Sequence, residues 1–160
     1  MYRNTFLSVM FLACCFNGSL CAQSDAQIYE RTCDAKTYPF SDPSPVATPN
    51  NSYYPYFRFD GFSMQAQEKQ WKMVVLENDY VKLTVTPEIG GKIWGAIDKV
   101  NNKEFVYTNG VVKFRDVAMR GPWTSGGIEF NFGIIGHAPT CSTPIDYLTK
   151  KNVDGSVSCH

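Results

Sequence analysis

Apolar and polar residues alternate along the middle of the chain. The alternation is clear in residues 71–76 and 81–86, and it resumes in residues 92–97 and 105–107. A period of two residues is typical of strands with one buried face. The segments between these runs are rich in Asn, Asp, Gly and Pro, which favour turns. We therefore expect an antiparallel meander with short connections.

Two more short strands are expected near the end of the chain, at 146–149 and 156–159, joined by a turn at 152–155. Aromatic residues make up 14% of the chain, and such residues favour strands over helices. The predicted fold class is therefore all-β and antiparallel. Within the meander, Ile93 and Ile97 are predicted to face the core.

The N-terminal segment has the features of a secretory signal. Arg3 precedes an apolar, uncharged stretch over residues 5–16, and small residues stand just before Gln23. The apolar stretch is too short to span a bilayer. We predict a signal peptide over residues 1–22, export to the periplasm or cell surface, and no transmembrane span in the mature chain. Lipidation of Cys14, which would leave a lipid anchor, is one alternative, and a retained N-terminal anchor is another.

Prolines recur in the polar stretch that follows. Because proline fixes φ and removes a backbone donor, residues 23–52 are predicted to form a polar, Pro-rich linker. Residues 53–160 are then expected to be the N-terminal portion of a β-sandwich domain. The chain stops at His160 inside an expected strand, whereas all-β domains often need roughly 200–250 residues. We expect a truncated product whose unpaired edge makes it unstable and inactive alone.

Charge and cysteine content narrow the classes of partner. The chain carries 15 basic and 15 acidic residues, and the basic ones are scattered. Nucleic acid is not expected as a partner, because it requires a concentrated basic patch.

The cysteines left after the signal are Cys33, Cys141 and Cys159. None has C-x-x-C spacing, so we predict no metal and no other cofactor. Cys141–Cys159 is the disulfide to test first, and the alternative is that each thiol is a small buried side chain.

Residues 114–131 follow no period and are predicted to form a loop beside the sheet. Sugar chemistry needs a carboxyl group that moves protons, donors for hydroxyl groups and an aromatic ring for the C–H face of the sugar. Glu129 and His137 are the predicted catalytic residues. Arg120 and Trp123 are the predicted substrate-binding residues, and carbohydrate is the predicted partner.

Each of these residues also has a structural interpretation. Glu129 can be a surface carboxylate, and His137 can be a loop histidine bonded to backbone. Trp123 can belong to the core. Arg120 can pair with Asp116 or with Glu129 instead of binding a ligand.

These motifs also carry a resemblance to a known family. The segments Pro87–Trp94, Arg120–Trp123, Ser125–Glu129 and Gly136–His137 resemble the N-terminal part of uncharacterised exported bacterial proteins. Members of that family have a galactose mutarotase-like domain, often followed by tetratricopeptide repeats, and the resemblance covers residues 53–160. It implies a two-sheet β-sandwich whose concave face binds carbohydrate.

The resemblance does not imply one reaction, because a fold does not determine function. In mutarotases the carboxylate base lies late in the chain and histidines act as acid, so Glu129 cannot be equated with that base by position. We predict an exported carbohydrate-processing protein, a glycoside hydrolase or a sugar epimerase in its full-length form. A non-catalytic carbohydrate-binding module and a structural or assembly domain are the alternatives.

Overall fold

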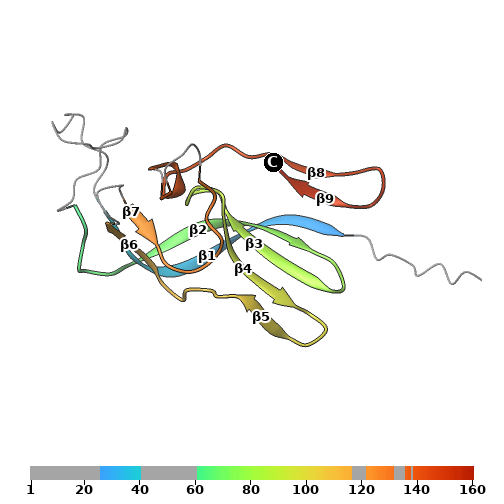
Figure 1. The fold of residues 1–160 in the computed structure, drawn as a ribbon, viewed down its shortest axis with the longest axis horizontal. Helices are drawn as coiled ribbons and strands as arrows, with labels where there is room; N and C mark the ends of the chain where they lie inside the picture. Colours follow the sequence, from blue (N-terminus) through green and yellow to red (C-terminus); the bar gives the residue numbers. More distant parts are fainter. Residues whose placement is uncertain (1–25, 41–60, 117–121, 132–135, 138) are drawn as a thin grey trace, which may run out of the picture.

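The computed structural model describes residues 26–40, 61–116, 122–131, 136–137 and 139–160. These residues are nearly all β, which confirms the predicted fold class. Seven strands form one sheet in the order β5-β4-β3-β2-β1-β6-β7, and two form a separate hairpin (Figure 1). The elements are β1 (Gln27–Tyr38), β2 (Gln67–Glu77), β3 (Val81–Thr86), β4 (Lys92–Asp98), β5 (Lys103–Val106), β6 (Val112–Asp116), β7 (Pro122–Thr124), the 3-10 helix η1 (Pro139–Cys141), β8 (Thr149–Lys151) and β9 (Val157–Cys159).

The expected meander is present as β2 to β5, and side chains close its turns. The Oδ1 atom of Asn78 accepts hydrogen bonds from the backbone N–H groups of Tyr80 and Val81, both at 2.9 Å. The Oδ1 atom of Asp98 accepts from Val100 N at 2.9 Å in the turn before β5. Asx side chains bonded in this way replace backbone partners within a turn.

Strand β1 corrects the predicted linker. Residues 27–38 lie inside the segment predicted to be a linker, but they pair with β2 along eleven positions, from Gln27↔Glu77 to Thr37↔Gln67. A strand is held by its backbone hydrogen bonds, so most of its side chains can be polar. Only alternate positions near its end, Cys33, Ala35 and Thr37, turn toward the core. The start predicted for the domain, near residue 53, lies outside the described residues.

Strands β6 and β7 correct the loop predicted over residues 114–131. They pair with each other antiparallel, with Phe114 opposite Thr124 and Arg115 opposite Trp123. Strand β6 also pairs with β1 in parallel over two positions, beginning at Thr37↔Val112. Strands this short show too few alternations for a period of two to be recognised.

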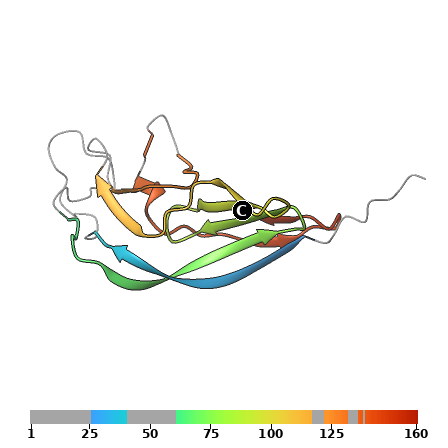
Figure 2. The ribbon, with the colours of Figure 1, turned by 90° about the horizontal axis from the view of Figure 1, so that it is seen from below.

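The sheet is curled, and its inner face holds the core. Figure 2 shows the bowed β1 and β2 strands from below. The core cluster combines β2, β4 and β6 with a turn residue, as Trp71, Met73, Ile89, Trp94, Val112 and Phe114. The indole Nε1 of Trp71 donates to Thr37 Oγ1 at 2.9 Å, which fastens β2 to β1 inside this core.

A β-bulge corrects the expectation that Ile93 and Ile97 share a face. The register shifts between Thr84 and Val85, so that Ile93 lies opposite Val85 while Ile97 lies opposite Lys82. Partners separated by an odd number of residues point to opposite faces of a sheet. Ile97 therefore points to the inner face, and Ile93 points to the outer face.

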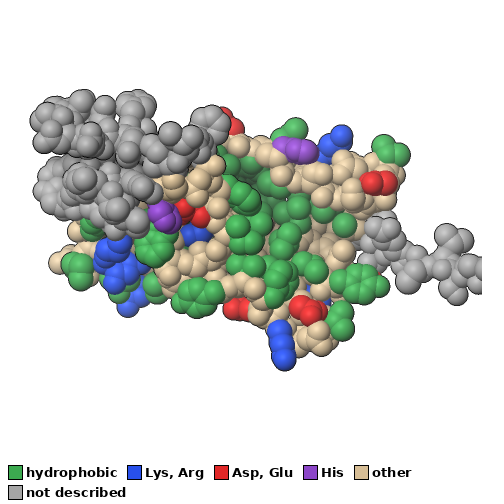
Figure 3. Space-filling view, viewed as in Figure 1, with side chains coloured by type: hydrophobic (Ala, Val, Ile, Leu, Met, Phe, Trp, Pro, Cys, Tyr) green, Lys and Arg blue, Asp and Glu red, His purple; other side chains and the backbone are tan. Residues whose placement is uncertain are grey.

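The outer face carries an apolar groove. Figure 3 shows apolar side chains gathered over the middle of the molecule. The groove has a volume of about 350 Å³. Its apolar lining includes Leu76, Leu83, Val85, Ile93, Phe130, Ile145 and Tyr147.

The expected C-terminal hairpin is present as β8–β9, but β8 begins at Thr149, where the predicted strand 146–149 ends. Its turn, 152–155, is closed by a hydrogen bond from Gly155 N to Asn152 O at 3.1 Å. Cys141 and Cys159 form no disulfide in the described part of the chain, where Cys141 is buried and Cys159 is partly buried. No helix in the described ranges has the length and apolarity needed to cross a bilayer.

Tyr147 links the segment before β8 to β1, and this link makes the stability of the fold depend on pH in the alkaline range. Its hydroxyl donates to Glu30 Oε1 at 2.6 Å. This hydrogen bond, followed by burial, raises the pKa of Tyr147 from 10.0 to about 12. Because the folded pKa lies above the unfolded one, the stabilisation is complete below pH 10 and is lost between pH 10 and about 12.

We therefore expect Tyr147→Phe to have a lower melting temperature than the parent near neutral pH. Above pH 10 the melting temperature of the variant should fall less steeply than that of the parent. Thermal melting across this pH range measures both effects. Tyr80→Phe, which alters an exposed tyrosine at another turn, should leave the parent profile unchanged. A Tyr147→Phe profile parallel to that of the parent would contradict this assignment.

Candidate functional site

A glycine-containing loop carries Glu129 across the end of β4. Ile93 and Ile128 form an antiparallel bridge, with N–H···O distances of 3.1 and 2.8 Å. Gly127 has a φ of +69°, and a Cβ atom at this residue would lie 2.3 Å from the carbonyl oxygen of Ile93. Only glycine allows both this conformation and this close approach. The loop therefore fixes the position of Glu129 through the backbone of β4.

The Glu129 side chain lies next to the ring of His137. Glu129 Oε1 lies 2.8 Å from His137 Nδ1, and the Glu129 side chain is 13% exposed. Both atoms are shielded from solvent, and neither makes a well-directed hydrogen bond within the described residues. His137 has a left-handed backbone, with a φ of +56°. A carboxylate opposite an imidazole is an arrangement suited to proton transfer.

Trp123 completes this side of the site. Its ring stands edge-on to the His137 ring, with the centroids 6.1 Å apart and the planes at 82°. Trp123 is half-buried in β7. Three of the four predicted site residues thus lie together, and the fourth, Arg120, lies outside the described residues.

Lys92 belongs to the same cluster, although nothing in the sequence marks it as a site residue. It is 2% exposed. Its Nζ atom donates to the carbonyl oxygen of Thr124 at 2.6 Å and to the Thr124 hydroxyl at 3.1 Å. Burial lowers the pKa of Lys92, while the charges of Glu129 and Cys141 act in the opposite direction. A lysine inside a strand gives no signal of burial in the sequence, because its partners come from residues more than thirty positions away.

Helix η1 supports the segment that follows Glu129. The thiol of Cys141 lies 3.2 Å from both the carbonyl oxygen of Phe130 and the Oδ1 atom of Asn131. In the described part of the chain, no three His, Cys, Asp or Glu side chains gather in a way that could hold a metal ion. The arrangement therefore offers acid–base groups, a buried cation and an aromatic ring.

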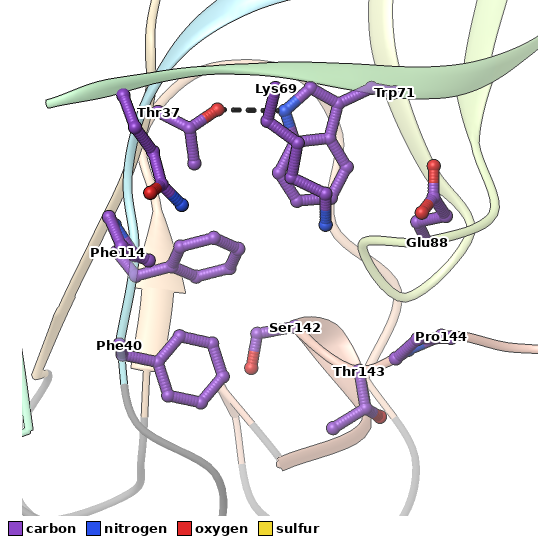
Figure 4. A pocket seen from close by; sticks show the side chains of 11 residues that line it. Thr37, Phe40, Lys69, Trp71, Glu88, Phe114, Ser142, Thr143 and Pro144 are labelled. Carbon is purple, nitrogen blue, oxygen red and sulfur yellow. Dashed lines mark hydrogen bonds between the residues drawn. The ribbon is translucent and has the colours of Figure 1, made fainter.

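A second concavity lies on the core side of the sheet, and its lining does not include Glu129 or His137. It has a volume of about 290 Å³, and the rings of Phe40, Trp71 and Phe114 line it (Figure 4). The ammonium group of Lys69 lies 3.7 Å from the centroid of the Trp71 ring. The carboxylate of Glu88 is fixed on another wall, where its Oε2 atom accepts a hydrogen bond from the backbone of β2 at 2.6 Å.

The chain is similar to a solved structure and matches a known family. The crystal structure of a TPR-domain containing protein from Parabacteroides distasonis ATCC 8503 is 29% identical and superposes with a TM-score of 0.72. The similarity covers 82% of this chain and 23% of that one, so the chain corresponds to about a quarter of that protein. Residues 48–160, more than two thirds of the chain, match the family described as "Domain of unknown function (DUF5107)", and the chain belongs to this family.

Proposed function

We propose that the chain is part of an exported carbohydrate-processing protein in which Glu129 and His137 exchange protons with a sugar. The observation that carries the proposal is the 2.8 Å approach of the Glu129 carboxylate to the His137 ring. A half-buried indole stands beside that ring. The resemblance to proteins with a galactose mutarotase-like domain supports sugar as the substrate class, and the apolar N-terminal stretch supports export.

The pair contains the groups that such chemistry requires. An ionised carboxylate only accepts hydrogen bonds, whereas an imidazole can donate from one nitrogen and accept at the other. Hydrolysis and epimerisation of a sugar both need a proton to be delivered at one oxygen or carbon and removed at another. Trp123 offers an apolar ring to the C–H face of a pyranose. The site thus supports acid–base chemistry on a sugar.

Glu129→Gln tests the proposal in the complete gene product that contains this chain. The amide keeps the size of the side chain but cannot accept a proton, so turnover on a glycan panel should fall by about a hundredfold. The Kd for the same sugar should change by less than about threefold. Glu104→Gln, at an exposed carboxylate on β5, is the matched control and should keep parental turnover. Unchanged turnover in Glu129→Gln would show that Glu129 is not a catalytic residue.

The pocket lined by Phe40, Trp71 and Phe114 favours a second candidate, a non-catalytic carbohydrate-binding module. Aromatic walls with a few charged and hydroxyl groups are common in small-molecule sites. The pocket does not include Glu129 or His137. Under this alternative, the parent binds sugar without turnover, and Glu129→Gln binds with the same affinity. If no sugar shifts the melting temperature, a structural or assembly role is favoured instead.

A further inference from the structure

An isolated bridge beside β4 places Lys92 across from Glu129. Ile93 and Ile128 are paired antiparallel and exchange two hydrogen bonds. At an antiparallel bridge the residue before one partner faces the residue after the other, so Lys92 and Glu129 are expected on the same side of this bridge.

The loop lies directly on the Lys92 side chain. A Cβ atom at Gly127 would approach the Cε atom of Lys92 to 3.2 Å. Two of the three ammonium donors can be directed at Thr124, at 2.6 and 3.1 Å. A lysine that is 2% exposed is costly unless a nearby negative charge balances it. Glu129 is a carboxylate whose negative charge acts on Lys92.

We infer that Lys92 is a positioning residue: its buried ammonium attracts the Glu129 carboxylate to its place beside His137 Nδ1 and so determines which nitrogen of His137 carries the proton. At 2.8 Å from a carboxylate oxygen, Nδ1 is expected to carry the proton, because two acceptors at this distance would repel each other. Nε2 then has a free lone pair and is the nitrogen that can take a proton from a ligand. Only this last step rests on the proposed function, because the arrangement of Lys92, Glu129 and His137 does not depend on the ligand.

The chain has two histidines, which allows a direct test. In a His160→Gln background His137 is the single imidazole, and ¹⁵N NMR at neutral pH reports which ring nitrogen is protonated. We expect the Nδ1–H tautomer in this background. Lys92→Met should lower the ratio of Nδ1–H to Nε2–H by about tenfold, because Glu129 loses the cation that holds its carboxylate beside Nδ1. Glu129→Ala, which removes the acceptor, should change the ratio in the same direction.

Lys99→Met is the matched control. Lys99 also donates to a backbone carbonyl at 2.6 Å, that of Asn78, but at an exposed turn outside this cluster. It should keep the parental ratio. A parental ratio in Lys92→Met would overturn the inference.

A double variant serves as the control for a folding defect in Lys92→Met. If Lys92→Met does not fold, Lys92→Met/Thr124→Val removes the acceptor hydroxyl as well, and the same tenfold loss is expected. A folded double variant with the parental ratio, or failure of both variants to fold, would assign Lys92 to stability alone and overturn the inference. If the complete gene product turns over no sugar while the tautomer responds as expected, the proposed function fails and the role of Lys92 stands.

Discussion

Replacing Trp71 by alanine should lower the free energy of unfolding by about 3–5 kcal/mol. Trp71 is 3% exposed and packs against Phe114, with ring centroids 6.2 Å apart. Its indole also joins β2 to β1 through Thr37. Alanine would leave a cavity at the centre of the inner face and would remove that hydrogen bond. Because small domains are stable by only about 5–15 kcal/mol, this loss is a large fraction of the total stability.

Urea unfolding followed by circular dichroism measures this loss. Trp71→Phe keeps most of the apolar volume and loses the indole donor, so its cost should be clearly smaller. Tyr80→Ala removes an aromatic ring that is 58% exposed and should stay within about 0.5 kcal/mol of the parent. A Trp71→Ala variant that loses less than about 1 kcal/mol would show that the inner face is not the centre of the fold.

The meander could be predicted because its information is local. Alternating residues and the turn residues Asn78 and Asp98 lie within a few positions of the strands they define. Strand β1 could not be predicted in the same way, because its partner β2 begins about forty residues after β1 begins and its own side chains are largely polar. The bulge between Thr84 and Val85 was hidden as well, since one shifted residue exchanges the two faces of a strand without changing its composition.

In the candidate site, too, local sequence information and long-range pairing determine different residues. Glu129, His137 and Trp123 could be chosen as candidates from their residue types beside a glycine-rich segment, and the structure brings the three together. Lys92 could not be predicted, because its burial results from Thr124 and the loop that crosses it. The cation predicted for the site, Arg120, lies outside the described residues, whereas Lys92 is a buried cation on which the charge of Glu129 acts. Residue type thus identifies the kind of group a site needs, and long-range pairing decides which residue supplies it.

Gly90→Ala should have the second large effect on stability, about 3 kcal/mol. Gly90 has a φ of +63°, and a Cβ atom there would lie 2.5 Å from the carbonyl oxygen of Thr140 and 2.6 Å from backbone atoms of Cys141. The left-handed conformation costs an alanine about 1–2 kcal/mol, and overpacking adds about 1–3 kcal/mol. The turn cannot easily move away, because Gly90 N also donates to the carbonyl oxygen of Thr143 at 2.8 Å.

The same substitution should disturb the Glu129 segment. Displacing Cys141 would break its contacts with Phe130 and Asn131, which follow Glu129 directly. Chemical denaturation measures the stability, and the His137 ring signals in the His160→Gln background report the site. Gly110→Ala is the control, because a Cβ atom there meets nothing within 4 Å. If Gly90→Ala were as stable as Gly110→Ala, helix η1 would have to move freely from the turn, and it could not then be the support that holds Glu129 against His137.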